Sequence, residues 1–167
     1  MFFWIPNAHI KYPTTIEGLQ AAVQAIKEGM RINMTLCFQQ EQAAAVYTAT
    51  KGAQKGQVFL SPFVGRLDDQ GKNGMDVIKN IIKMYKNGDM HVELLAASLR
   101  NIDHLLYSLK LGADIVTAPY KVLEGWVQKS LPIPQENYQY KPKNLENIPY
   151  RKLIWQETGR SILFHTS

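Results

Sequence analysis

The sequence has only one cysteine, Cys37, in 167 residues. An internal disulfide is therefore excluded, and a cysteine-based metal site is not expected. A single thiol suits a reducing compartment, and we expect the protein to be cytoplasmic. A run of about 18 apolar residues is also absent, so no membrane span is predicted. Residues 1–6 are apolar, but they lack the basic segment and cleavage pattern of a signal peptide and are more typical of a strand.

Blocks of basic residues are missing as well. The net charge is +5 and the pI about 9.3, but the lysines and arginines are scattered along the chain. A nucleic-acid partner is therefore not indicated, whereas the charge fits small anionic substrates such as sugar phosphates. No Gly-x-Gly-x-x-Gly motif follows an apolar run, so the dinucleotide-binding fingerprint is absent. We expect neither a cofactor nor a metal ion.

What the sequence contains is an alternation of short β-rich runs with longer amphipathic runs. The strands are expected at residues 8–12, 31–38, 57–63, 91–97 and 113–117. The helices are expected from Thr14 to the stop at Gly29, over 40–51 and 76–86, from Ile102 to the stop at Gly112, and over 120–129. Such alternation implies an α/β fold with parallel strands joined by right-handed crossovers.

The first helix has the clearest signals. Thr14 and Glu17 have the spacing of a capping box, which predicts that the helix begins at Thr14. One apolar helix face is predicted from residues that recur every three or four positions: Ile16, Leu19, Val23 and Ile26.

Two architectures fit five such strands: an open α/β sheet, or part of a (β/α)8 barrel, because a full barrel needs about 200 residues or more. After Lys129 the alternation stops. The residues that follow are mostly polar, with prolines and tyrosines at intervals. This composition predicts either an ordered tail that wraps the domain or a loose linker.

Polar residues recur where the expected strands end. They are Lys11, Asn33, Thr35, Ser61, Arg66, Ser98, Arg100 and Thr117. In parallel α/β folds the C-terminal strand ends form the functional face. Plainer interpretations exist for single residues: Thr35 and Thr117 as ordinary strand threonines, Ser98 and Asn101 as helix caps, and Arg66 as a surface arginine.

Lys11 stands out among them because a lysine at the inner end of a buried strand is disfavoured in its charged form. A neutral amine can attack a carbonyl and form a Schiff base. The alternative is a solvated surface charge. Together with two arginines, whose planar forks suit phosphate oxygens, Lys11 indicates carbonyl chemistry on a phosphorylated substrate.

Four segments resemble a known family, the transaldolases, which include fructose-6-phosphate aldolase as a relative. They are Ile10–Leu19, Ile32–Leu36, Ser61–Arg66 and Ala97–Asn101. Ser61–Arg66 is the most specific, and Gly112–Thr117 matches the strand that follows. The segments occur in family order, and the resemblance covers roughly residues 8–130.

The resemblance implies a role for each matching residue. Lys11 forms the imine with the donor ketose, and Thr35 helps hold the water that shuttles protons. Asn33 and Ser61 bind substrate hydroxyls. Arg66, Ser98 and Arg100 bind the sugar phosphate. Phe63 favours transfer, because the fructose-6-phosphate aldolases tend to carry tyrosine there.

The implied reaction transfers a dihydroxyacetone unit between sugar phosphates in the pentose phosphate pathway. Fructose 6-phosphate, sedoheptulose 7-phosphate, erythrose 4-phosphate and glyceraldehyde 3-phosphate are the implied substrates. The alternatives are a catalytically incompetent barrel fragment that binds sugar phosphate or needs a partner chain, and an aldolase-type cleavage. A homo-oligomer is a further expectation.

The resemblance begins at the family's fourth strand. We therefore expect residues 1–130 to form a partial (β/α)8 barrel domain and residues 131–167 a tail. The family's first three strands carry an aspartate, an asparagine and a glutamate that serve in acid–base chemistry, and we expect this chain to lack them and the final C-terminal helix. Met1 is then expected to be an internal methionine of a longer gene.

Overall fold

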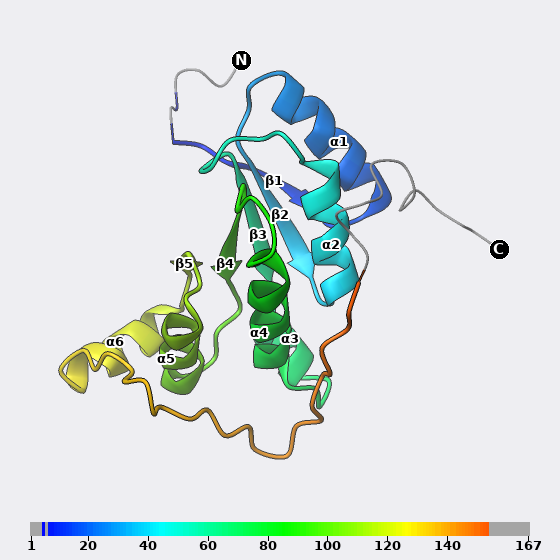
Figure 1. Ribbon diagram of the computed structural model, residues 1–167. Helices are drawn as coiled ribbons and strands as arrows, with labels where there is room; N and C mark the ends of the chain where they lie inside the picture. Colours follow the sequence, from blue (N-terminus) through cyan, green and yellow to red (C-terminus); the bar gives the residue numbers. More distant parts are fainter. Residues whose placement is uncertain (1–4, 6, 154–167) are drawn as a thin grey trace.

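The computed structural model describes residue 5 and residues 7–153, and it contains one parallel five-stranded sheet (Figure 1). The strand order follows the chain: β1 (Ile10–Pro13), β2 (Ile32–Cys37), β3 (Val58–Pro62), β4 (Val92–Ala96) and β5 (Ile115–Val116). Each strand pairs in parallel with the next. The predicted α/β alternation is therefore confirmed, and it is consistent with part of a (β/α)8 barrel.

Helices follow every strand in the described part of the chain. They are α1 (Ile16–Lys27), α2 (Gln40–Ala49), α3 (Val64–Asp68), α4 (Gly74–Tyr85), α5 (Ile102–Leu111) and α6 (Tyr120–Gln128). The short helix α3 was not predicted. Its five residues make little more than one turn, so no helical period can show in the sequence.

The predicted start of α1 is wrong by one residue. Thr15, and not Thr14, is the N-cap, since its side chain accepts a hydrogen bond from the Gly18 amide (3.1 Å). The Thr14 hydroxyl instead donates to the Thr35 carbonyl on β2 (2.7 Å). Both threonines suit a cap by composition, and only the neighbouring strand decides between them.

The buried face of α1 matches the expected one only in part, since Leu19 and Ile26 pack against the core while partly buried. Its buried residues are Gly18, Ala22 and Ala25, whereas Ile16 is 41% exposed. The small residues let the helix approach the chain beneath it. A Cβ on Gly18 would lie 1.9 Å from the Pro13 carbonyl oxygen, so a glycine is required there.

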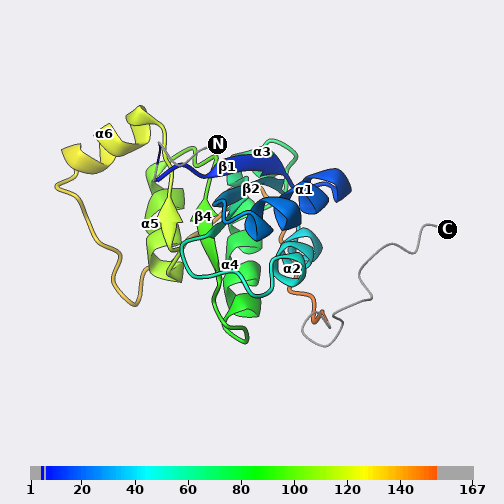
Figure 2. The same ribbon diagram turned by 90° about the horizontal axis from the view of Figure 1, so that it is seen from above.

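One face of the sheet is covered and the other is open. Helices α1, α2, α4 and α5 lie on the same side of the strands (Figures 1 and 2). The strand side chains that point toward them are buried: Ile32, Met34, Val58, Leu60, Val92 and Leu94. Alternate residues on the opposite face, such as Asn33, Phe59 and Glu93, are only half-buried. The described residues therefore form a core on one side of the sheet alone.

The C-terminal segment lies against the helices as an extended strap, residues 131–153, that passes α5 and α4 and reaches α2 (Figure 1). Tyr138 donates a hydrogen bond to Asp103 on α5 (3.1 Å). Farther along, the Asn80 amide on α4 donates to the Ile148 carbonyl (3.0 Å). These contacts favour the ordered tail over the loose linker. The residues of the expected family tail beyond 153 lie outside the described part.

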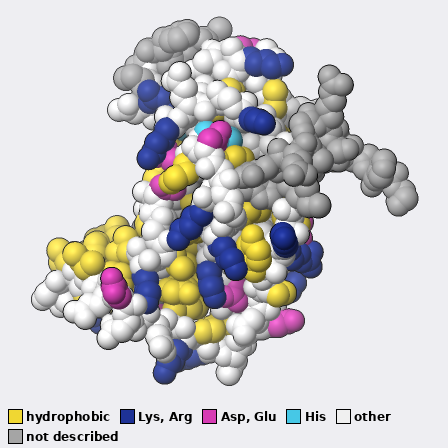
Figure 3. All heavy atoms as spheres, in the orientation of Figure 1, with side chains coloured by type: hydrophobic (Ala, Val, Ile, Leu, Met, Phe, Trp, Pro, Cys, Tyr) yellow, Lys and Arg dark blue, Asp and Glu magenta, His cyan; other side chains and the backbone are white. Residues whose placement is uncertain are grey.

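Helix α6 leaves apolar side chains in the open. It buries only Val122, while Tyr120, Leu123 and Val127 are exposed, as are Leu131 and Ile133 in the residues that follow. Figure 3 shows hydrophobic side chains gathered where Figure 1 places α6. An apolar surface of this kind marks a place where another polypeptide can pack.

We expect Gln40→Ala to loosen the strap where it meets α2. The buried Gln40 amide donates to the Arg151 carbonyl (2.7 Å) and accepts from the Arg151 amide (3.0 Å). Losing both bonds should lower the free energy of unfolding by about 1–2 kcal/mol and speed hydrogen exchange at the Arg151 amide. Glu41→Ala is the control, because it removes only the exposed ion pair to Arg151 (2.6 Å) and should cost less than about 1 kcal/mol. Equal exchange rates in both variants would show that Gln40 does not hold the strap.

Candidate active site

A cavity of about 440 Å³ opens at the C-terminal ends of the strands. Its lining includes residues from or just beyond all five: Lys11, Asn33, Ser61, Phe63, Arg66, Leu95, Ala97, Ser98, Leu99, Arg100, Thr117 and Pro119. Seven of the eight predicted site residues are thus brought together, although they come from distant parts of the sequence. Parallel strands cause this, because their C-terminal ends meet at one edge of the sheet.

Lys11 is exposed, and the expectation of a buried lysine is wrong for the described structure. It lies on β1, at one edge of the sheet, opposite Asn33 on β2. Its side chain lies on the uncovered face of the sheet, where no described residue shields it from solvent. The amine is nevertheless accessible to a molecule in the cavity.

Two polar residues next to Lys11 are already oriented by each other. The Ser61 hydroxyl donates to Asn33 Oδ1 at 2.6 Å. Ser61 is 1% exposed and Asn33 is half-buried, so their hydrogen bond is partly shielded from water. The ring of Phe63 forms one wall of the cavity and meets Phe38 edge to face, with centroids 6.1 Å apart.

The two arginines provide the positive charge of the cavity. Arg66 comes from α3 and forms no ion pair with any of the described residues. Arg100 follows β4, and its Nη2 lies 3.0 Å from Asp69 Oδ2. Both partners of that pair are about half-exposed, so the pair itself contributes little stability. Two guanidinium groups on one cavity suit an anion such as a phosphate.

The chain between β4 and α5 is held in an unusual backbone shape. Ser98 has φ +60°, a left-handed conformation that costs a non-glycine residue about 1 kcal/mol or more. Its carbonyl accepts from the Gly65 amide (2.9 Å), and the Ala97 carbonyl accepts from the Val64 amide (3.0 Å). These bonds fix the Ser98 segment to α3 and so place both arginine-bearing segments side by side.

Thr35 is the one predicted site residue that does not line the cavity. It lies opposite Ser61 in the sheet and is 9% exposed. Its Oγ1 has no hydrogen-bond partner among the described residues, which is costly for a buried hydroxyl unless a water satisfies it. The predicted role in holding a water therefore stays a prediction.

The sequence did not single out two residues that contact the arginine segments. Asp69 pairs with Arg100, and His104 on α5 lies 3.1 Å from Asp68. Asn101 is the N-cap of α5, as the plainer interpretation had it, and accepts from the His104 amide (2.8 Å). Ser98 does not cap that helix. Sequence spacing gives no signal for pairs that join separate elements.

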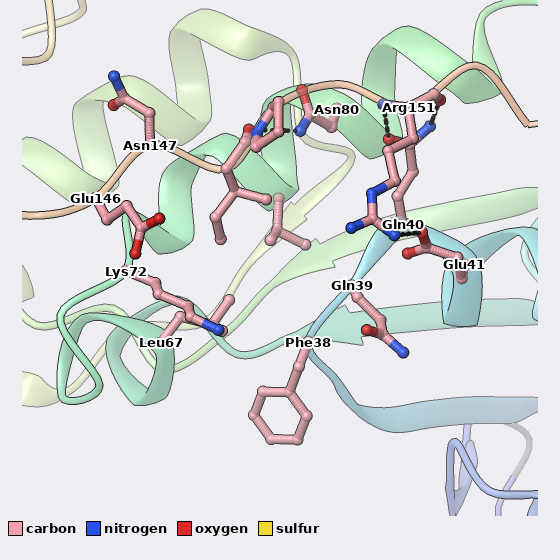
Figure 4. A pocket seen from close by; sticks show the side chains of 13 residues that line it. Phe38, Gln39, Gln40, Glu41, Leu67, Lys72, Asn80, Glu146, Asn147 and Arg151 are labelled. Carbon is pink, nitrogen blue, oxygen red and sulfur yellow. Dashed lines mark hydrogen bonds and ion pairs between the residues drawn. The ribbon is translucent and has the colours of Figure 1, made fainter.

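A second cavity, of about 270 Å³, lies apart from these residues between α2, α4 and the strap (Figure 4). Its charges are mixed: Lys72 and Arg151 stand against Glu41 and Glu146. Figure 4 shows Arg151 joined to Gln40 and Glu41 at one end. None of the predicted site residues lines this cavity.

The described residues contain neither a membrane-spanning helix nor a metal-binding cluster. No helix there is both long and apolar enough to cross a bilayer. No cluster of three or more His, Cys, Asp or Glu side chains there could hold a metal ion.

An amine and two guanidinium groups around one cavity at the strand ends define a candidate site for a carbonyl-bearing anion. Comparison with known proteins gives the family. Residues 3–155 match the family described as Transaldolase/Fructose-6-phosphate aldolase, and the chain belongs to that family.

Three relatives illustrate the similarity. A "Probable transaldolase" of Brucella ovis is 44% identical over 156 residues, which is 93% of this chain and 64% of the relative. Proteins of the same name from Dehalococcoides mccartyi and Roseiflexus sp. are each 44% identical, over 128 and 121 residues. These alignments cover 77% and 72% of this chain, and 56% and 53% of the relatives. The chain thus spans between half and two thirds of the curated relatives it matches.

Proposed function

We propose that the protein carrying this chain transfers a dihydroxyacetone unit from a ketose phosphate to an aldose phosphate through an imine on Lys11. The observation that carries the proposal is the cavity that Lys11 shares with Arg66 and Arg100. The family membership and the relatives' names agree with it. The substrates would be the sugar phosphates of the pentose phosphate pathway, in the cytoplasm.

In this proposal the Lys11 amine adds to the ketose C2 carbonyl, and loss of water gives the iminium ion. Breaking the C3–C4 bond releases an aldehyde as the C4 hydroxyl loses its proton, and the electron pair stays on C3 as an enamine. The enamine carbon then attacks the acceptor aldehyde, and water releases the product from Lys11. Arg66 and Arg100 hold the phosphate, while the Asn33–Ser61 pair binds hydroxyls.

Phe63 bears on the choice between transfer and cleavage. A phenyl ring has no hydroxyl that could donate a proton to the enamine, so the enamine can wait for an aldehyde. Transfer is therefore the first candidate and simple aldol cleavage, as in fructose-6-phosphate aldolase, the less favoured one.

A second candidate function is sugar-phosphate binding by a chain that needs a partner for turnover. Two observations favour it: Lys11 lies on an uncovered face, and α6 exposes an apolar surface. The family's acid–base residues belong to strands that precede the lysine strand. A partner chain, or a longer protein, would have to supply them to this cavity.

Borohydride trapping tests the proposal. The protein is incubated with fructose 6-phosphate, reduced, and digested for mass spectrometry. We expect an adduct on the peptide that contains Lys11. If the protein bound phosphate but formed no adduct, the second candidate, sugar-phosphate binding without turnover, would be favoured. If it neither bound phosphate nor formed an adduct, the proposed site would be wrong.

A further inference from the structure

We propose that His104 is a positioning residue that sets the distance between the two arginine-bearing segments of the site, through a ring that accepts at Nδ1 and donates at Nε2. This inference rests on the proposed function, since it concerns how Arg66 and Arg100 come to bind one phosphate.

The histidine bridges two segments that the sequence keeps far apart. His104 is 2% exposed and lies in the first turn of α5. Its Nδ1 accepts a hydrogen bond from the backbone amide of Arg100 (3.3 Å). Its Nε2 lies 3.1 Å from Oδ2 of Asp68, the last residue of α3, and α3 carries Arg66. One rigid ring therefore joins the backbone of one arginine to the helix of the other.

The partners decide where the proton sits. A backbone amide can only donate, and an ionised carboxylate can only accept. The neutral ring with its proton on Nε2 satisfies both, whereas a proton on Nδ1 would face the Arg100 N–H. Burial lowers the pKa of His104, against the opposing influence of Asp68 and Asp103 and with the help of the Arg100 charge. The neutral form is the one that the fold favours.

The carboxylate is itself fixed on its other side. Asp68 Oδ1 accepts from the Gly74 amide at the start of α4 (2.9 Å). The Tyr140 hydroxyl of the strap lies 3.3 Å from Nε2 and helps close the ring from solvent. His104 thus has a defined contact from α3, from the Arg100 segment and from the strap.

The buried contact between His104 and the Arg100 amide is better suited to fixing the position of Arg100 than the exposed ion pair with Asp69 is. Arg100 is also held by Asp69, but that pair is about half-exposed and is screened by water and salt. The His104 contacts are shielded, so losing them should shift Arg100 relative to Arg66. A two-point phosphate clamp is sensitive to such a shift.

Two variants separate the roles of the two ring nitrogens. In His104→Asn the amide oxygen can take the place of Nδ1 and accept from the Arg100 amide. In His104→Gln the amide nitrogen can take the place of Nε2 and donate to Asp68, but no acceptor remains for Arg100. We expect the affinity for inorganic phosphate and for fructose 6-phosphate to fall about tenfold in His104→Gln and to stay within about threefold in His104→Asn.

Ser108→Ala is the structural control. Ser108 is fully buried on α5, and its hydroxyl donates to the His104 carbonyl (2.7 Å), so its loss perturbs the same helix without touching the ring. We expect a lower Tm with unchanged phosphate affinity. Equal phosphate affinity in the wild type and His104→Gln would overturn the positioning role while leaving the proposed function intact. A wild type that binds neither ligand would overturn both.

Nitrogen NMR of the histidine rings in the wild-type chain gives a readout that needs no ligand and no variant. We expect the His104 signals of a neutral ring protonated at Nε2. A ring protonated at Nδ1 would contradict the proposal even if every variant failed to fold.

Discussion

Lys11→Arg is expected to abolish the borohydride-trapped adduct while leaving phosphate binding in place. Arginine keeps the positive charge beside the cavity, but its guanidinium remains protonated and does not form an imine with a ketose. Arg66 and Arg100 are untouched by the change. The variant should therefore bind inorganic phosphate within about threefold of the wild type, since no direct phosphate ligand is lost. Mass spectrometry and calorimetry on the same preparations measure the two properties.

Lys72→Arg is the matched control. Lys72 is also an exposed lysine, but it lines the other cavity. Its replacement should leave the adduct unchanged, which excludes nonspecific reaction of surface amines. If the adduct persisted in Lys11→Arg and disappeared in Lys72→Arg, the nucleophile would be Lys72 in the second cavity, and the proposed site would be wrong. Persistence in both variants would mean that trapping reports no specific site.

The fold was predictable because its signals are local. Strand and helix alternation is carried by the period of apolar residues, and parallel pairing follows from the helical crossovers. The same logic brought polar residues at the strand ends to one edge of the sheet. Lys11, Ser61 and Arg100 reach one cavity although they are far apart in the chain. The Gly112 stop is equally local, since its φ of +79° suits glycine at the end of α5.

Features that depend on a neighbouring element were missed. Thr15 caps α1 because the Thr14 hydroxyl bonds to β2 instead. The burial of Lys11 depends on what covers the open face of the sheet. The residues that flank Lys11 in the sequence do not indicate whether that face is covered. His104 is an ordinary helix residue in the sequence, and its link to Asp68 exists only after α3 and α5 pack together.

Gly65→Ala is expected to destroy the phosphate clamp. A Cβ at this position would lie 2.2 Å from Arg100 Nε and 2.5 Å from the Ser98 carbonyl oxygen. Real Cβ atoms essentially never come within 3.0 Å of a neighbour, so the Arg100 side chain must leave its place. The Ser98 backbone must shift as well, because its carbonyl oxygen is a separate contact, and Ser98 is already in a strained conformation. We expect at least a tenfold loss of phosphate affinity and a loss of about 1–3 kcal/mol in stability.

Gly125→Ala shows whether that loss is specific. Gly125 is also a helical glycine, in α6, but the nearest atom to its added Cβ is Ile102 Cδ1 at 3.2 Å, the mobile end of a side chain. Alanine favours the helix by about 1 kcal/mol, which offsets the tight contact, so stability should change little. Phosphate affinity should match the wild type, because Gly125 does not line the cavity. If Gly65→Ala bound phosphate as well as Gly125→Ala does, the position of Arg100 over Gly65 would have no part in anion binding, and the clamp would have to be assigned to Arg66 alone.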